Sequence, residues 1–153
     1  MSRVKAIAEE FTELLNAHND WTTAFHAEFQ WDAFEKLEDD RIRVLVIPSF
    51  VRRMPDDSAR DLTSRTYGIS VVVQKRLYQT QQLPDIEEVD ELLTIVEEIW
   101  EFVEPNEDAP LNLPTTNVGY IDTDHDAGQL LDPDSLDRGL FTNVSTFTFE
   151  DVQ

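Results

Sequence analysis

The spacing of apolar residues changes along the chain, and this change restricts what the chain can fold into. Residues 3–18 and 85–104 carry apolar side chains at every third or fourth position, which is typical of amphipathic helices. Elsewhere apolar residues alternate with polar ones or form short β-branched runs, which is typical of strands. The predicted strands are residues 24–31, 42–48, 65–77, 117–122 and 140–149.

These segments follow one another in the order α-β-β-β-α-β-β. For 153 residues we expect a single domain, 1–153, of the α+β class. Its sheet is expected to be mostly antiparallel, with about five strands packed with two amphipathic helices. In the strand at 42–48, apolar residues at both odd and even positions predict cover on both faces, and Pro48 is expected to end it. Asp85 and Glu88 have the spacing of a capping box at the second helix.

Three segments between these elements are predicted to be irregular. Residues 32–40 are acidic, and Phe34 and Leu37 are expected to hold a short helical turn there. Residues 51–64 predict a long charged loop, and long loops in compact domains are functional or disordered. Residues 123–138 predict a second, acidic loop.

The charge excludes several classes of function. The chain has 12 Lys and Arg against 32 Asp and Glu, a formal charge of −20. Such a surface disfavours tight binding to nucleic acid and to anionic lipid. It fits a salt-adapted protein, a nucleic-acid mimic, or a surface that must not adhere to DNA.

Other compositional features bear on cellular location. The absence of cysteine excludes disulfides, thiolate metal sites and cysteine nucleophiles. No apolar run has the length of a membrane span, and the N-terminus has no apolar signal core. We therefore expect a soluble protein used inside a cell, or in a particle assembled there.

One acidic motif has a partial likeness to a calcium loop. Asp122, Asp124 and Asp126 alternate and precede Gly128, but an EF-hand needs Gly at the sixth position and Glu at the twelfth. Ala127 and Pro133 stand at those positions here. A solvated acidic loop is the preferred interpretation, with a weak non-EF cation site as the alternative.

Nothing in the sequence indicates catalysis. His18, His26 and His125 lie on different elements without metal-ligand spacing, and no nucleophile elbow or phosphate-binding glycine loop occurs. The carboxylates of the second helix lie opposite its apolar stripe, where water keeps them unreactive. We expect no enzyme activity, no cofactor and no metal.

The charged loop at 51–64 is the candidate contact site. It carries Arg52, Arg53, Asp56, Asp57, Arg60 and Asp61. Three arginines in an acidic protein predict an electrostatic latch for an acidic neighbour, including a second copy of the chain. The alternative is a flexible surface loop without a partner.

Three segments together resemble a known family. They are IRVLVIP at 42–48, SRTYGISVVVQKRL at 64–77 and LDPDSLDRGLFTNVSTFTF at 131–149. In order and spacing they are similar to the tail terminator, or tail-completion (head–tail joining), proteins of long-tailed bacteriophages. In that family a helix precedes a strand pair, a long strand, an amphipathic helix and a final strand.

The resemblance implies a structural protein of the virion neck. It implies a homohexameric ring at the head-proximal end of the tail tube, contacting the tail tube protein and the head-completion (connector) protein. Assembly would occur in the host cytoplasm, and DNA would pass through the ring without specific binding. An acidic channel agrees with this, because it repels the phosphate backbone.

Two other classes share the acidity. An acidic DNA mimic that inhibits a DNA-binding enzyme would display carboxylates at phosphate-like spacing. A halophilic enzyme subunit would carry glycine-rich or histidine-containing site loops, which this sequence lacks.

Overall fold

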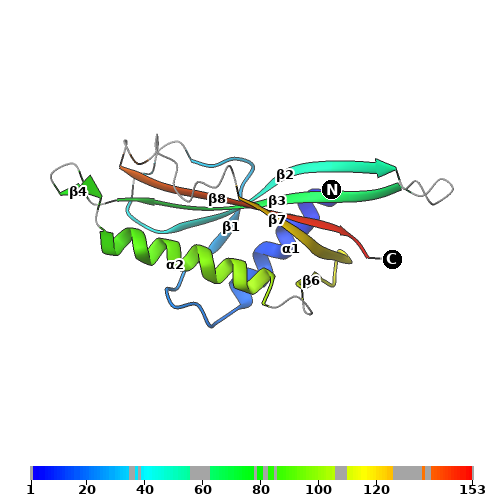
Figure 1. Ribbon diagram of the computed structural model, residues 1–153, viewed down its shortest axis with the longest axis horizontal. Coiled ribbons are helices and arrows are strands. Elements are labelled where there is room, and N and C mark those ends of the chain that lie inside the picture. The colour runs from blue at the N-terminus through cyan, green and yellow to red at the C-terminus, as the bar shows by residue number, and fades with distance from the viewer. Residues whose placement is uncertain are drawn as a thin grey trace.

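The computed structural model describes residues 2–34, 37, 39–55, 63–77, 79–80, 83–84, 86–105, 110–125, 136 and 139–152. It confirms the α+β class, with two helices and a mostly antiparallel sheet of six strands (Figure 1). The helices are α1 (Arg3–Ala17) and α2 (Ile86–Val103). The strands are β1 (Ala27–Phe29), β2 (Arg43–Pro55), β3 (Thr63–Arg76), β4 (Gln79–Thr80), β5 (Leu83–Pro84), β6 (Asn112–Leu113), β7 (Val118–His125) and β8 (Leu140–Asp151).

The main sheet has the strand order β1-β2-β3-β8-β7-β6. β1 is parallel to β2, and every other neighbouring pair in this sheet is antiparallel. The two central strands, β3 and β8, pair over eleven positions, from Thr66 opposite Glu150 to Arg76 opposite Leu140. β4 and β5 form a separate two-stranded ribbon. The middle of the sheet therefore joins segments that are far apart in the sequence.

Both helices lie on the same face of the sheet (Figure 1). Their apolar stripes bury Ile7, Phe11 and Leu15 from α1 and Leu92, Ile95 and Ile99 from α2. The ring of Phe11 packs edge-on against two rings of β8, with centroids 5.8 Å from Phe147 and 5.7 Å from Phe149. Most carboxylates of α2 are exposed and form the predicted solvated face, namely Glu87, Asp90, Glu91, Glu97 and Glu101. Glu88 instead forms an ion pair with Lys75 at 2.6 Å, and Glu98 is half-buried against Thr22.

The opposite face of the sheet has a smaller apolar cluster and a polar centre. Leu45, Ile47 and Val72 form the cluster, with Phe34 packed against it, so β2 is covered on both faces as the sequence predicted. On the same face the hydroxyls of Ser70 and Thr146 are 2.8 Å apart across β3 and β8.

The first strand is shorter than predicted. Only Ala27–Phe29 pair with β2, not the whole of 24–31. Phe25 packs on Trp21 instead, with ring centroids 4.8 Å apart, and Trp31 is exposed. Alternation of apolar residues alone therefore overstated the length of the strand.

The expected end of the second strand at Pro48 was wrong. β2 continues to Pro55 through a bulge between Pro48 and Phe50. Proline is tolerated there because β2 is an edge strand beyond its short pairing with β1. The loop predicted at 51–64 was therefore wrong at both ends, since residues 51–55 belong to β2 and residues 63–64 to β3.

Other expectations lie wholly or partly outside the described residues. β7 runs to His125, so residues 123–125 of the predicted acidic loop belong to a strand, and residues 126–135 and 137–138 are not described. Asp85 of the predicted capping box and most of the turn expected around Phe34 and Leu37 are not described either. No helix in the described part of the chain has the length and apolar character needed to cross a membrane.

Candidate interaction surface

The distal halves of β2 and β3 form an arm that projects beyond the helical layer (Figure 1). We use the name arm for residues 50–55 and 63–67. Arg52 and Arg53 lie on β2 in this arm and are exposed, whereas Asp56, Asp57, Arg60 and Asp61 lie outside the described residues. The structure therefore places two of the six predicted contact residues, and it places them on a strand.

A stack of three residues stiffens the arm. The ring of Phe50 lies over Gly68, so that a Cβ on Gly68 would be 2.3 Å from Phe50 Cε1. The guanidinium of Arg52 lies 4.3 Å from the centre of the same ring. Such a cation–π contact orients the charged group while it stays accessible. Sequence reasoning missed Phe50 and Gly68, because their contact depends on the register of β2 against β3.

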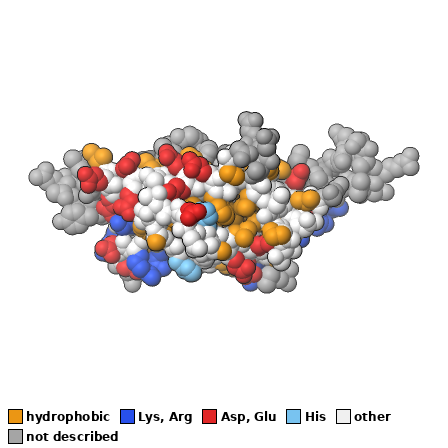
Figure 2. Space-filling model, turned by 90° about the horizontal axis from the view of Figure 1, so that it is seen from below, with side chains coloured by type: hydrophobic (Ala, Val, Ile, Leu, Met, Phe, Trp, Pro, Cys, Tyr) orange, Lys and Arg blue, Asp and Glu red, His pale blue; other side chains and the backbone are white. Residues whose placement is uncertain are grey.

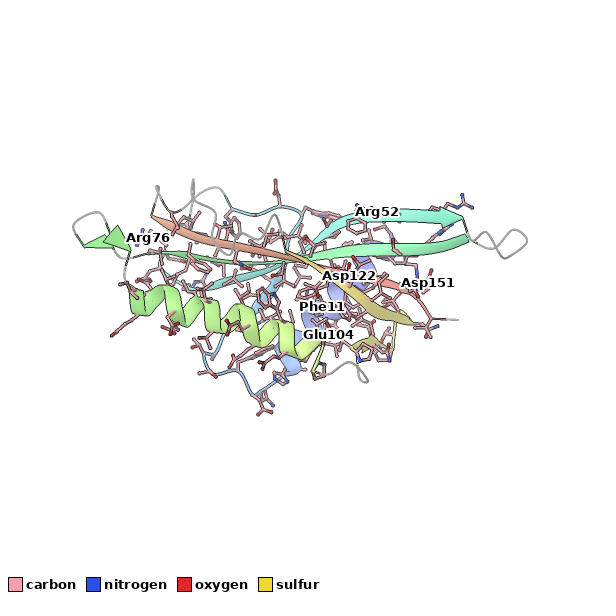
Figure 3. The ribbon with its side chains drawn as sticks, in the orientation of Figure 1. Phe11, Arg52, Arg76, Glu104, Asp122 and Asp151 are labelled. Atoms are coloured by element: carbon pink, nitrogen blue, oxygen red, sulfur yellow. The ribbon has the colours of Figure 1, made fainter. Side chains whose placement is uncertain are left out.

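The base of the arm is fastened to the end of β8. Arg3 Nε donates to Asp151 Oδ1 at 3.0 Å, and the hydroxyl of Tyr67 donates to Asp151 Oδ2 at 3.3 Å. The hydrogen bond to Asp151 raises the pKa of the Arg3 guanidinium. The start of α1, the arm and the end of β8 are therefore tied at one place, which Figure 3 marks at Asp151.

The two edges of the sheet are covered only in part. β1 pairs with Val44–Val46 of β2, and Gln30 N donates to Val46 O at 3.1 Å. Among the described residues, no strand pairs with the outer edge of β2 from Ile47 to Pro55. We call this segment the β2 edge. It carries Arg52 and Arg53 and no carboxylate.

The opposite side of the sheet has a similar uncovered segment. β6 pairs with Val118 and Gly119 of β7, and Tyr120 N donates to Leu111 O at 3.0 Å. From Ile121 to His125, no strand in the described part of the chain pairs with the outer side of β7. We call this segment the β7 edge. Ile121 is 47% exposed at a bulge, and the exposed Asp122 follows it (Figure 3).

The predicted cation motif falls on this β7 edge. Asp122 lies on an extended strand, and Asp126 and Gly128 are outside the described residues. Within the residues that the structure describes, no three His, Asp or Glu side chains are grouped as metal ligands would be. The extended backbone at Asp122 differs from the tight turn that a calcium loop needs.

One hollow lies between the end of α1 and the end of α2. Its volume is about 570 Å³, and it is lined by His18, Asp20, Trp21, Glu98, Glu101, Phe102 and Pro105. The imidazole of His18 packs on Trp21, with centroids 4.5 Å apart, and Glu98 accepts a 3.2 Å bond from the backbone of Thr22.

A second hollow of about 460 Å³ contains His26 beside Arg41 and Arg43. Arg43 forms ion pairs with Glu28 at 3.0 Å and with Asp39 at 3.2 Å. The backbone hydrogen bond from Arg41, with the charges of Arg41 and Arg43, lowers the pKa of Asp39. The cations of this hollow are thus neutralised within the subunit. The third histidine, His125, ends β7, away from the other two on the chain.

Figure 2 views the molecule from the side on which the helices lie, and it shows carboxylates spread over this surface around a central patch of hydrophobic side chains. Comparison of the chain with protein-family models finds no match, and comparison with curated proteins finds none either.

Proposed function

We propose that the chain is a structural component of a tailed-phage particle, a tail terminator of the head–tail joining class. It forms a homohexameric ring at the head-proximal end of the tail tube, ends tube polymerisation and joins the tube to the head-completion protein. The protein acts in the virion neck after assembly in the host cytoplasm. It performs no catalysis and holds no cofactor.

The observation that carries this proposal is the projecting arm. Its strands extend beyond the helical layer, so that Val51 is 53% exposed and Arg52 and Arg53 face solvent. A long two-stranded projection gains little stability alone, because it buries little apolar surface. An arm of this kind is expected where a neighbouring subunit or partner covers it.

The order of elements also supports the proposal. The fold has a helix, a strand pair, a long strand, an amphipathic helix and a final strand, which is the order that the resemblance implies. The exposed carboxylates Glu87, Asp90, Glu91, Glu97 and Glu101 fit a ring that repels the DNA passing through it.

Electron microscopy tests the proposal. The purified protein is mixed with tail tubes from the same particle, and six-fold rings are expected at one end of each tube. Arg52→Glu is expected to reduce capping of the tubes without changing the fold. The matched control is Arg41→Glu, which makes the same charge change at an exposed residue paired with Asp39 away from the arm.

Two outcomes would overturn the proposal. One is a particle structure in which this chain lies outside the head–tail junction. The other is stoichiometric inhibition of a DNA-binding enzyme, such as a nuclease, by displacement of its DNA. The second outcome would favour an acidic DNA mimic.

A further inference from the structure

We infer that neighbouring copies of this chain join edge to edge, with the β2 edge of one copy pairing antiparallel with the β7 edge of the next. The sheets of adjacent subunits would then form one continuous sheet around the ring. This inference rests on the proposed function, because it names the contact that closes the ring.

The first argument comes from unsatisfied backbone groups. An edge strand presents a row of free N–H and C=O groups, and proteins cover such edges or pair them. Here the first strand is covered, because the Asn16 carboxamide binds both backbone groups of Ala27. In the described part of the chain, the β2 edge and the β7 edge have no such cover.

The second argument comes from strand direction and level. β2 and β7 run in opposite directions in the sheet, so two copies related by rotation about an axis along the strands would pair them antiparallel. Phe50 lies opposite Gly68, Gly68 opposite Thr148, and Thr148 opposite Asp122. Phe50 and Asp122 therefore lie at the same position along the strand direction, which we call the same level. The uncovered parts of both edges overlap at this level.

The third argument comes from the side chains at that level. Directly opposed residues project from the same face of a sheet, and so do residues two apart on a strand. Arg52, two residues beyond Phe50, therefore projects from the same face as Asp122. Arg52 on the β2 edge and Asp122 on the β7 edge are both exposed, so the two edges carry complementary charges there.

Exposed apolar side chains also lie on the β2 edge and the β7 edge. Val51 and Ile121 are among the few exposed large apolar side chains of the described residues, at 53% and 47%. Val51 lies opposite Tyr67, Tyr67 opposite Phe149, and Phe149 opposite Tyr120, the neighbour of Ile121. Pairing of the edges would cover both side chains at once.

This contact joins two different surfaces, so it is heterologous. A heterologous contact makes a closed ring when the rotation between copies closes, and it makes an open filament otherwise. The bulges in β2 and β7 increase the local bend and twist, which provides curvature for closure.

The absence of cysteine makes a direct test possible. The double variant Val51→Cys with Ile121→Cys places one thiol on each edge. Val51 is level with Tyr120, so the bulge residue Ile121 lies one residue along from it, and the two thiols come within reach of a disulfide only where the edges pair. Oxidation of the protein assembled on tubes is expected to give a ladder of covalent oligomers that ends at the hexamer. Each single variant is expected to give no ladder, because a heterologous contact brings unlike edges together.

A second cysteine pair checks the alignment, and a third serves as control. Pro48 is level with Thr123 through Ile69 and Phe147, so Pro48→Cys with Thr123→Cys is also expected to give the ladder. Val51→Cys with Ile86→Cys is the control, because Ile86 is 84% exposed and lies on α2 away from both edges.

Charge reversal provides a readout without oxidation. Arg52→Glu and Asp122→Arg are each expected to lower the yield of rings about fivefold, because like charges then face each other. The double variant is expected to restore the yield of rings. Arg41→Glu is the matched control, since Arg41 is exposed, pairs with Asp39 and lies outside both edges.

The outcomes separate this inference from the proposed function. Rings that form on tubes but give no ladder with either edge pair, and that tolerate Arg52→Glu and Asp122→Arg, overturn the edge contact and leave the proposed function standing. An unmodified protein that forms no ring on tubes overturns both.

Discussion

The carboxamide of Asn16 binds the backbone of Ala27 as a neighbouring strand would. Asn16 Oδ1 accepts from Ala27 N at 2.7 Å, and Asn16 Nδ2 donates to Ala27 O at 2.9 Å. A side chain from the last turn of α1 therefore covers the outer edge of β1 and fixes this three-residue strand beside β2.

Replacing Asn16 with alanine is expected to destabilise the protein by about 1–2 kcal/mol, because two hydrogen bonds to the backbone of β1 are lost. Urea unfolding measures this change, with Asn19→Ala, an exposed asparagine two residues beyond the helix, as control. Equal stability of the two variants would show that Asn16 does not hold β1.

The carboxyl of Glu10 is expected to make the stability of the protein sensitive to acid. Burial by itself would raise the pKa of this carboxyl, but hydrogen bonds from Thr116 N at 2.8 Å, Thr116 Oγ1 at 2.6 Å and Thr115 N at 2.7 Å outweigh it and lower the pKa. A lowered pKa in the folded state stabilises the protein above the pKa of the unfolded state. That stabilisation is lost as the pH falls through the folded-state pKa.

The variant Glu10→Gln is expected to remove this part of the pH dependence. Its free energy of unfolding should be about 1–3 kcal/mol lower than that of the unmodified protein at neutral pH, with a smaller difference below about pH 4. Glu13→Gln, at an exposed position of the same helix, is the control. Parallel pH profiles for the Glu10 variant and the unmodified protein would contradict the role of Glu10.

Gly68 and Phe50 are expected to be energetically coupled. Gly68→Ala should cost about 1–3 kcal/mol, because the new Cβ would overlap the Phe50 ring. In a Phe50→Ala background the same change should cost far less, since the ring is gone. A double-mutant cycle by urea unfolding measures the coupling, and additive effects would mean that the ring moves aside freely.

The isolated protein is expected not to bind duplex DNA at about 0.15 M salt, because binding gains free energy when Lys and Arg replace condensed counterions. Fluorescence anisotropy of a labelled duplex measures this. The arm carries three exposed arginines, Arg52, Arg53 and Arg65, and Arg52→Glu should leave the result unchanged. Binding that weakens in this variant would assign the arm to DNA instead of a protein neighbour.

The helices and the central strands were predictable because their patterns are local. Phe11 and Ile95 follow the three–four spacing of a buried helical stripe, and Val71 and Val73 follow strand alternation. The continuation of β2 past Pro48 was not predictable, because it depends on the position of β2 at an edge. β2 has a free edge there because the three-residue strand β1 covers only Val44–Val46.

The candidate site was predicted in part. The sequence indicated Arg52 and Arg53 because they are cations in an acidic chain, and this signal depends on composition alone. Their place on a strand and their level relative to Asp122 follow from the strand order, which brings β8 between β3 and β7. The spacing of residues in the sequence does not indicate that strand order, so the edges could be recognised only in the folded chain.

The strand order also has a consequence for folding in the cell. β3 acquires its second neighbour only when β8 pairs with it, and residues such as Gly68 and Thr148 are then joined across the greater part of the chain. Contacts between such distant segments form slowly, because a large loop must close first. During synthesis the β2–β3 hairpin therefore emerges long before β8, with the inner side of β3 unpaired. A chaperone that shields this strand would be expected to raise the yield of folded protein.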